Sequence, residues 1–305
     1  MKRTSTAVAL ATVGILAFAA CGSSSTPLST SSSSSSGTSA AGGDIVVGSA
    51  NFSESVLLAE IYAGALRAKG INATTKTNIG AREIYLKALQ DNSVQVLPEY
   101  TGALALNYDP KFDKTDPNEV YTALQGLIPS DTRVLDKSAA EDNDSIVVTK
   151  QTADAKHLTT IADLASVAGS MTLSAPPEFK TRPQGIPGLK RDYGVVFKSF
   201  RPLTGQALVQ ALKNGQVDAA NIFSTDPAIA ANGFVILQDT KKLFGSQNIV
   251  PLVRSDVATR VATALNAVSA ALTTQKLSAM LQQTDVDKKD PKAVAQEFLT
   301  ANNLG

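Results

Sequence analysis

Residues 88–95 read Ala-Leu-Gln-Asp-Asn-Ser-Val-Gln, and residues 211–218 read Ala-Leu-Lys-Asn-Gly-Gln-Val-Asp. The first stretch begins at residue 88 and the second at residue 211, 123 positions later. Each stretch predicts the end of a helix, a tight turn and a strand. The same spacing then leads to an aromatic and a hydroxyl residue, Tyr100-Thr101 in one copy and Phe223-Ser224 in the other. This repeat predicts two similar α/β units. The alternative is a chance match, because helix–turn–strand units are common in α/β folds.

The residues around the repeat alternate between strand and helix patterns. The expected strands are 44–49, 71–77, 94–97, 146–148, 171–173, 217–221, 235–237 and 249–253, and the expected helices are 54–69, 81–90, 160–168, 185–193, 208–214, 257–281 and 291–302. The first helix should begin with Ser53 as its N-cap and end at Gly70. The alternation predicts an α/β architecture with largely parallel sheets. Ligands bind such sheets in the crevice at the carboxyl ends of the strands, where we expect Tyr100 and Phe223.

The composition excludes several classes of function. The chain has 305 residues, with 28 Lys and Arg against 27 Asp and Glu, so it lacks the basic excess of a nucleic-acid-binding protein. Its one Cys and one His leave no disulfide framework and few metal or acid–base clusters. It has no glycine-rich phosphate-binding loop and no GxSxG or HExxH motif. We therefore expect no metal, no cofactor and no enzyme activity.

Three acidic residues, Glu54, Glu99 and Asp226, lie near the ends of expected strands. They could form acidic pairs in the crevice. We favour the other interpretation, in which they cap helices or form salt bridges within one unit.

The first 43 residues have the pattern of an exported and tethered protein. Lys2 and Arg3 precede an apolar run from Ala7 to Ala20 that is too short to span a bilayer comfortably, so residues 1–20 are expected to be a signal peptide. The small residues before Cys21 resemble a bacterial lipobox, which implies cleavage before Cys21 and lipidation, including palmitate. The alternative is an ordinary signal peptide followed by an unused Cys. Residues 21–43 are rich in Ser and Gly and are expected to be a disordered tether.

Five short motifs follow one another along residues 44–300: Val46 to Ser55, Gly80-Ala81-Arg82-Glu83, Pro98-Glu99-Tyr100-Thr101-Gly102, Arg182-Pro183-Gln184-Gly185 and Phe223-Ser224-Thr225-Asp226. In this order they resemble the substrate-binding proteins of glycine betaine/carnitine/choline ABC importers. The resemblance implies a type II periplasmic-binding-protein fold, with two α/β lobes joined by a two-strand hinge and the ligand in the cleft between them. Residues 44–148 and 250–305 would form lobe I, and residues 149–249 would form lobe II.

The resemblance also implies a partner and a location. The protein would bind a small solute at the extracytoplasmic face of the cell membrane, where lipid on Cys21 anchors it. It would deliver the solute to the permease subunits of an ABC importer, and it would act as a monomer without nucleic acid. Two other functions stay open on the same fold: a sensory lipoprotein that presents its ligand to a receptor, and an enzyme.

The resemblance assigns ligand contacts to ten residues: Asn51, Phe52, Tyr100, Thr101, Ser145, Phe179, Arg182, Phe223, Ser224 and Thr225. In relatives, aromatic rings hold a trimethylammonium group by cation–π attraction, and polar groups hold a carboxylate. Here Ser145 and Val209 stand where rings are expected, and Ala50 and Ala103 stand where polar contacts are expected. One hypothesis is a ligand of the glycine betaine, choline or carnitine class in a rearranged set of rings. The other is a less cationic, planar aromatic ligand held between Tyr100 and Phe223.

Overall fold

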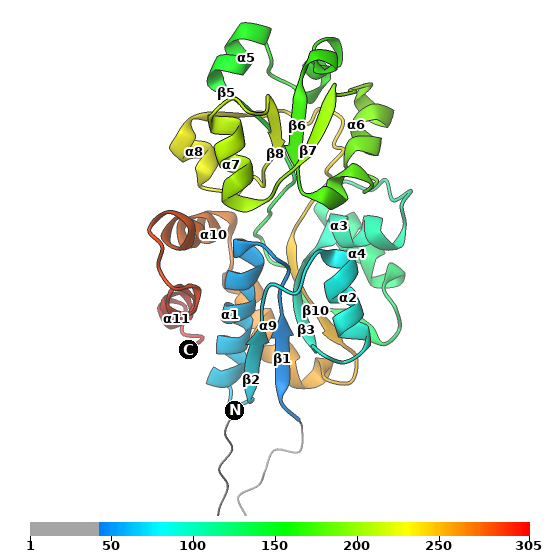
Figure 1. Ribbon diagram of the computed structural model, residues 1–305. Helices are drawn as coiled ribbons and strands as arrows, with labels where there is room; N and C mark the ends of the chain where they lie inside the picture. Colours follow the sequence, from blue (N-terminus) through cyan, green and yellow to red (C-terminus); the bar gives the residue numbers. More distant parts are fainter. Residues whose placement is uncertain (1–42) are drawn as a thin grey trace, which may run out of the picture. The chain divides into compact units, whose positions relative to one another are not determined.

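A computed structural model describes residues 43–305, which form two five-stranded β-sheets with helices packed on both (Figure 1). The predictions for the signal peptide, for Cys21 and for residues 21–42 of the tether lie outside the described residues. In the described part of the chain, no helix combines the length and the apolar character that crossing a lipid bilayer requires. We refer to each sheet with its own helices as a lobe.

The first lobe takes its strands from both ends of the described chain. Its sheet has the order β2-β1-β3-β10-β4, with β1 (Ile45–Gly48), β2 (Ala73–Lys76), β3 (Val96–Tyr100), β4 (Thr132–Val134) and β10 (Ile249–Arg254). Its helices are α1 (Ser53–Ala68), α2 (Arg82–Gln90), α3 (Thr101–Tyr108), α4 (Pro117–Leu127), α9 (Ala258–Ala271), α10 (Thr274–Leu281) and α11 (Pro291–Ala301), and a π-helical turn (Gln282–Val286) follows α10. Helix α1 packs against α9 and α11, and its Leu57, Leu58 and Ile61 are fully buried in the core. This packing fixes the N-terminus of α1 at the edge of the lobe that faces the second sheet.

The second lobe has the sheet order β7-β6-β8-β5-β9. Its strands are β5 (Ile146–Thr149), β6 (Thr172–Ala175), β7 (Ser199–Pro202), β8 (Ala219–Asn221) and β9 (Phe234–Leu237). Its helices are α5 (Lys150–Lys156), α6 (Ile186–Tyr193), α7 (Gly205–Lys213) and α8 (Ala228–Asn232), with 3-10 turns at Ile161–Ser166, Ala168–Ser170 and Pro177–Lys180. Separate hydrophobic clusters lie on the two faces of this sheet, one beneath α6 and the other beneath α7.

The sequence repeat occupies equivalent places in the two sheets. Strand β3 lies beside β1, and β8 lies beside β6, both in parallel and each as the third strand of its sheet. The turns before these strands also match, because Asn92 has a φ of 64° and Gly215 a φ of 65°. Asn and Gly adopt this left-handed conformation at the least steric cost. The prediction of two similar α/β units is confirmed.

Strands β5 and β10 differ from the prediction of largely parallel sheets. Strand β10 runs antiparallel to β3 and β4, and β5 runs antiparallel to β8 and β9. Each of them enters its sheet directly from the other lobe instead of through a helical crossover, which is the connection that parallel neighbours need.

The chain crosses between the lobes twice, near residues 142–145 and 244–248. The expected boundary after residue 148 placed residues 146–148 in lobe I, but β5 begins at Ile146 and pairs entirely within the second sheet. The return also comes one residue earlier than expected, since β10 begins at Ile249. The two crossing segments contact each other where Glu141 forms an isolated antiparallel bridge with Asn248.

Two local predictions differ in detail. Residues 160–168 form short 3-10 turns instead of an α-helix. The residue that precedes the first turn of α1 is Phe52 and not Ser53, because the Ser53 hydroxyl donates to Asp285 Oδ2 at 2.7 Å instead of capping its own helix. Gly70 follows the end of α1 with a φ of 74°, as expected.

Candidate functional site

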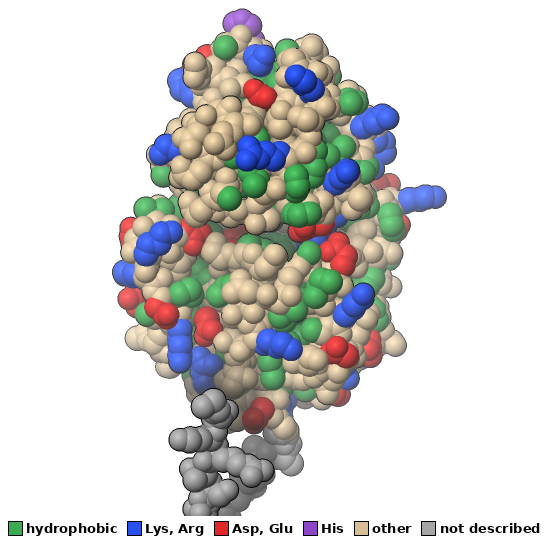
Figure 2. Space-filling view, in the orientation of Figure 1, with side chains coloured by type: hydrophobic (Ala, Val, Ile, Leu, Met, Phe, Trp, Pro, Cys, Tyr) green, Lys and Arg blue, Asp and Glu red, His purple; other side chains and the backbone are tan. Residues whose placement is uncertain are grey.

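A cavity of about 540 Å³ lies between the two lobes, and residues of both lobes line it. The space-filling view shows a hollow in the surface between the two lobes (Figure 2). The walls of the cavity include the N-termini of α1, α2 and α7, the segments after β3 and β8, and the first crossing segment. A cavity of this volume is in the range of small-molecule sites.

Seven of the ten residues expected to contact a ligand line this cavity: Asn51, Phe52, Tyr100, Phe179, Arg182, Phe223 and Thr225. They come from both lobes and from segments as far apart in sequence as residues 51 and 225. Tyr100 and Phe223 both line the cavity, as we expected from the prediction that the two copies of the repeat face one crevice.

The other three expected residues, Thr101, Ser145 and Ser224, do not line the cavity. Their hydroxyls bond to nearby main-chain groups instead. Thr101 Oγ1 accepts from the Asn248 N–H at 3.1 Å, Ser145 Oγ donates to the Ile222 carbonyl, and Ser224 Oγ accepts from the Asn143 N–H at 2.9 Å. These bonds hold the crossing segments and the end of β8 in place, so the three residues support the site without reaching it.

Three aromatic rings that line the cavity lie close together. The centroid of Phe52 lies 6.1 Å from that of Tyr100 and 5.3 Å from that of Phe223, with tilted ring planes in both pairs. Rings at these distances are in contact. Phe52 and Phe223 therefore pack together across the boundary between the lobes, and Phe52 contacts both of the rings that we expected to flank a ligand. A cation in the cavity would meet the ring faces that this cluster leaves uncovered.

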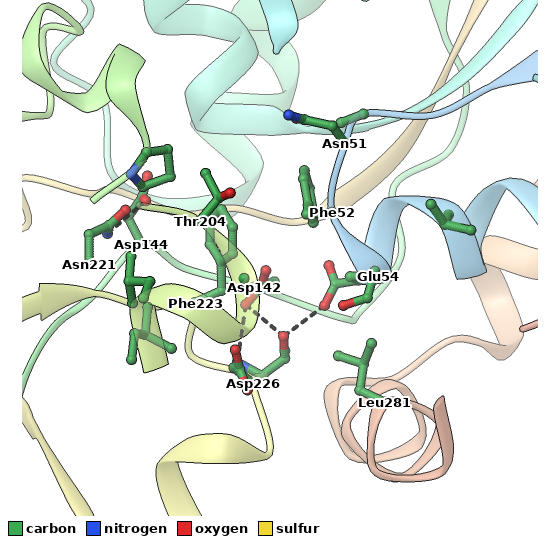
Figure 3. Close-up of a pocket in the computed structure, with 18 of the residues that line it drawn as sticks. Asn51, Phe52, Glu54, Asp142, Asp144, Thr204, Asn221, Phe223, Asp226 and Leu281 are labelled. Atoms are coloured by element: carbon green, nitrogen blue, oxygen red, sulfur yellow. Dashed lines mark hydrogen bonds between the residues drawn. The ribbon is translucent and has the colours of Figure 1, made fainter. Parts of the chain in front are cut away.

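Two buried carboxyl groups lie beside the rings and share one hydroxyl (Figure 3). Thr225 Oγ1 is 2.7 Å from Glu54 Oε2 and 2.8 Å from Asp142 Oδ1, and the Tyr100 hydroxyl donates to Glu54 Oε1 at 2.7 Å. Glu54 is 3% exposed and Asp142 is 2% exposed. Burial raises the pKa of Glu54 to about 7, against the lowering effect of the Tyr100 and Thr225 hydrogen bonds. Burial and the neighbouring Glu54 raise the pKa of Asp142 well above its usual value.

Glu99 and Asp226 have the roles that we favoured from the sequence, a salt bridge within one lobe and a helix cap. Glu99 accepts two hydrogen bonds of 3.0 Å from the guanidinium of Arg82, and a third of 2.7 Å from the Tyr85 hydroxyl. Asp226 accepts from the Ala228 N–H at 2.8 Å, at the start of α8. The expectation was wrong for Glu54 alone, which forms an acidic pair with Asp142 of the first crossing segment.

Arg182 joins the two lobes at another part of the cavity. Its Nε and Nη2 atoms each lie 3.3 Å from a carboxylate oxygen of Glu83 in the first lobe, and Nη2 lies 3.9 Å from Glu178. Partial burial alone would raise the pKa of Glu83, but the hydrogen bond and charge of Arg182 lower it below its usual value. Carboxylates thus engage both arginines that line the cavity, Arg82 and Arg182.

Sequence reasoning missed two groups of cavity residues. The first is Asp142 and Asp144 on the crossing segment, for which their position just before an expected strand was the available signal. The second is the C-terminal segment, which contributes Leu281, Asp285 and Lys288. The C-terminal helices were expected only to cover the first lobe. The π-helical turn after α10 brings them to the N-terminus of α1, where Asp285 accepts from Ser53.

Comparison with known proteins places this arrangement in a family. The family described as "Substrate binding domain of ABC-type glycine betaine transport system" matches residues 43–301. A glycine-betaine-binding protein of Pseudomonas aeruginosa is 25% identical over 273 residues, which cover 85% of this chain and 88% of that protein. The Escherichia coli glycine betaine-binding protein YehZ is 26% identical over 276 residues, 85% of this chain and 90% of that protein.

Solved structures share the fold. The crystal structure of a glycine betaine/carnitine/choline ABC transporter protein covers 86% of this chain and 99% of its own, with a TM-score of 0.68 and 24% identity. An ABC-transporter choline-binding protein in complex with choline covers 85% of this chain and 89% of its own, with a TM-score of 0.64 and 14% identity. Because the family match extends over almost all of the described residues, the chain belongs to the substrate-binding domains of ABC-type glycine betaine transport systems.

Proposed function

We propose that this chain is the extracytoplasmic solute-binding protein of an ABC importer, and that its solute is a small quaternary amine of the glycine betaine, choline or carnitine class. The observation that carries the proposal is the cluster of Phe52, Tyr100 and Phe223 in a cavity between two lobes. Aromatic faces attract a quaternary ammonium group, which carries its charge on methyl groups and cannot donate a hydrogen bond. Family membership and the names of the relatives support the same class of solute.

The two lobes close around the solute by a hinge motion. The crossing segments near residues 142–145 and 244–248 form the hinge, with residues 44–141 and 249–305 in one lobe and residues 146–243 in the other. The Phe52–Phe223 contact and the Glu83–Arg182 ion pair both span the lobes, so both favour a closed form. A solute that binds better between closed lobes shifts the population toward that form, which the permease subunits then recognise. The protein acts as a monomer. It captures the solute and delivers it without a chemical reaction.

The N-terminal segment anchors the protein to the membrane. In this proposal residues 1–20 are removed as a signal peptide, lipid is attached to Cys21, and residues 21–43 form a tether to the folded part. Mass spectrometry of the mature protein tests it: a diacylated or triacylated N-terminal Cys21 is expected, and an unmodified Cys21 would remove the anchor from the proposal.

Calorimetric titration of the purified protein tests the solute class. The compounds are glycine betaine, choline and carnitine, beside a set of uncharged planar aromatic molecules. We expect micromolar binding of at least one quaternary amine and none of the planar compounds. At 100 times the dissociation constant, the bound solute should add about 2.7 kcal/mol of apparent stability, which a thermal shift detects. Binding of planar compounds alone would refute the quaternary-amine assignment and favour the other ligand hypothesis.

A further inference from the structure

The two contacts that Thr225 makes with Glu54 and Asp142 need one proton more than the Thr225 hydroxyl supplies. Thr225 Oγ1 lies within hydrogen-bond distance of an oxygen of each carboxyl group, at 2.7 and 2.8 Å. A hydroxyl has one proton and can donate to only one of them. The second contact is a hydrogen bond only when the other carboxyl group is protonated and donates to Thr225 Oγ1. The geometry therefore favours a pair that holds one proton and carries one negative charge.

No positive group of the described residues pairs with these two carboxyls. The titratable groups that face them from neighbouring elements are Tyr100 at the end of β3, Asp144 on the crossing segment, Asp226 after β8 and Asp285 on the π-helical turn. All of them are neutral or acidic.

The basic side chains that line the cavity are occupied elsewhere. Arg82 bonds to Glu99, and Arg182 bonds to Glu83. Of the two lysines, Lys288 donates to the carbonyl of Asp285 and Lys289 donates to Gln283. No salt bridge among residues 43–305 involves Glu54 or Asp142, so the acidic pair has no cationic partner in the described part of the chain.

An unused acceptor points to what the pair binds. Asp142 lines the cavity and is 2% exposed, yet its Oδ2 atom has no hydrogen-bond partner among the described residues. Gln184, which also lines the cavity and is 3% exposed, has an unpartnered Oε1. A buried acceptor without a donor costs free energy, so both atoms favour a ligand that brings hydrogen-bond donors.

We propose that the Glu54–Asp142 pair is a subsite for a carboxylate-free organic cation with a hydroxyl or N–H donor, and that the pair releases its proton when this cation binds. This inference rests on the proposed function and narrows its solute class. The donor of the ligand bonds to Asp142 Oδ2, the ammonium group lies against the rings, and the displaced proton goes to solvent. The net charge of the site is unchanged, because one positive charge leaves and one arrives.

A zwitterion is the poorer ligand for such a site. Its carboxylate finds neither a free arginine nor a donor at the pair, and it approaches Glu54, Asp142 and Asp144. A site that hydrogen-bonds a hydroxyl of its ligand also rejects analogues that lack the hydroxyl, because its acceptors are then left unpaired. Choline should therefore bind more tightly than glycine betaine, by about tenfold or more.

Calorimetry at several pH values tests the inference. Choline and glycine betaine are titrated into the purified protein between pH 5.5 and 8, each in two buffers that differ in ionisation enthalpy, which gives the number of protons released. We expect release of nearly one proton with choline near pH 6. Below the pKa of the pair, choline affinity should then rise up to about tenfold per pH unit. The raised pKa of Glu54 puts this change within reach of the assay.

Two variants locate the effect. Glu54→Gln and Asp142→Asn should each abolish the release of the proton and flatten the pH dependence, whereas Glu60→Gln, on the same helix but outside the cavity, should behave like the unmodified protein. Proton release is also measured on the unmodified protein, so the inference can still be tested if a variant folds poorly. Choline binding without proton release, or glycine betaine binding as tightly as choline, would overturn the inference and leave the proposed function standing. If neither compound binds, the inference fails, and the titration with carnitine decides whether the proposed function fails as well.

Discussion

The buried carboxyl of Glu54 should make the unliganded protein less stable as the pH rises. Its pKa is raised in the folded state, from 4.5 to about 7, mainly by burial. Between these values the folded protein holds a proton that the unfolded chain has lost, so the free energy of unfolding falls with increasing pH. The stabilisation is complete below pH 4.5 and is lost as the pH passes through about 7. This is the opposite of the behaviour of a carboxylate in a salt bridge.

The magnitude follows from the shift. One pKa unit corresponds to 1.36 kcal/mol, so the difference between 4.5 and about 7 corresponds to a loss of about 3 kcal/mol from pH 4.5 to pH 8. The raised pKa of Asp142 acts in the same direction. Replacing Glu54 with Gln removes the titrating group and keeps the size of the side chain.

Urea unfolding of the ligand-free protein at pH 5, 6, 7 and 8 measures the effect. The difference in unfolding free energy between the unmodified protein and Glu54→Gln should change by about 2.5 kcal/mol across this range, with the unmodified protein losing stability relative to the variant. Glu60→Gln, a half-buried position on the same helix, serves as the matched control and should follow the unmodified protein. Parallel curves for the unmodified protein and Glu54→Gln would refute the reasoning.

Four further predictions concern backbone packing, one buried hydrogen bond and one ion pair between the lobes. Gly185→Ala should lower the unfolding free energy by at least about 2 kcal/mol in urea, because its Cβ would lie 1.9 Å from the Phe179 carbonyl oxygen. Gly126→Ala in α4, where the new Cβ meets nothing within 4 Å, should instead raise it by about 0.5–1 kcal/mol. Tyr100→Phe keeps the ring but removes the donor to Glu54, and should cost about 1–3 kcal/mol by the same assay; no loss would mean that this hydrogen bond is absent in solution. Glu83→Gln removes a partly exposed ion pair, so stability should change by less than about 1 kcal/mol, while small-angle scattering should show a larger radius of gyration if the pair holds the lobes together.

Local sequence signals were sufficient for the repeated units of the fold. The turn at Asn92 and its counterpart at Gly215 each need a residue that tolerates positive φ, and each sequence supplies one. The pattern located the strands that follow, predicted at 94–97 and 217–221, to within three residues of the ends of β3 and β8. Tyr100 and Phe223 then reach the cavity because they sit at the ends of equivalent strands.

Features that depend on contacts between distant segments could not be read in this way. Nothing in the sequence around Glu54 indicates Thr225, which lies 171 positions away and contacts it only because the chain crosses between the lobes. The same crossings make β5 and β10 antiparallel. Ser53 has the residue type of an N-cap, but the C-terminal segment brings Asp285 to its hydroxyl and changes its role.

The location of a bound quaternary amine is the most direct test of the proposed site. In a crystal structure of the protein with choline, the ammonium nitrogen should lie within about 6 Å of the centroid of at least one of Phe52, Tyr100 and Phe223, between the two lobes. Its hydroxyl should lie within hydrogen-bond distance of Asp142 Oδ2. Choline bound outside this cavity, or inside it with the nitrogen away from all three rings, would contradict the assignment of the site.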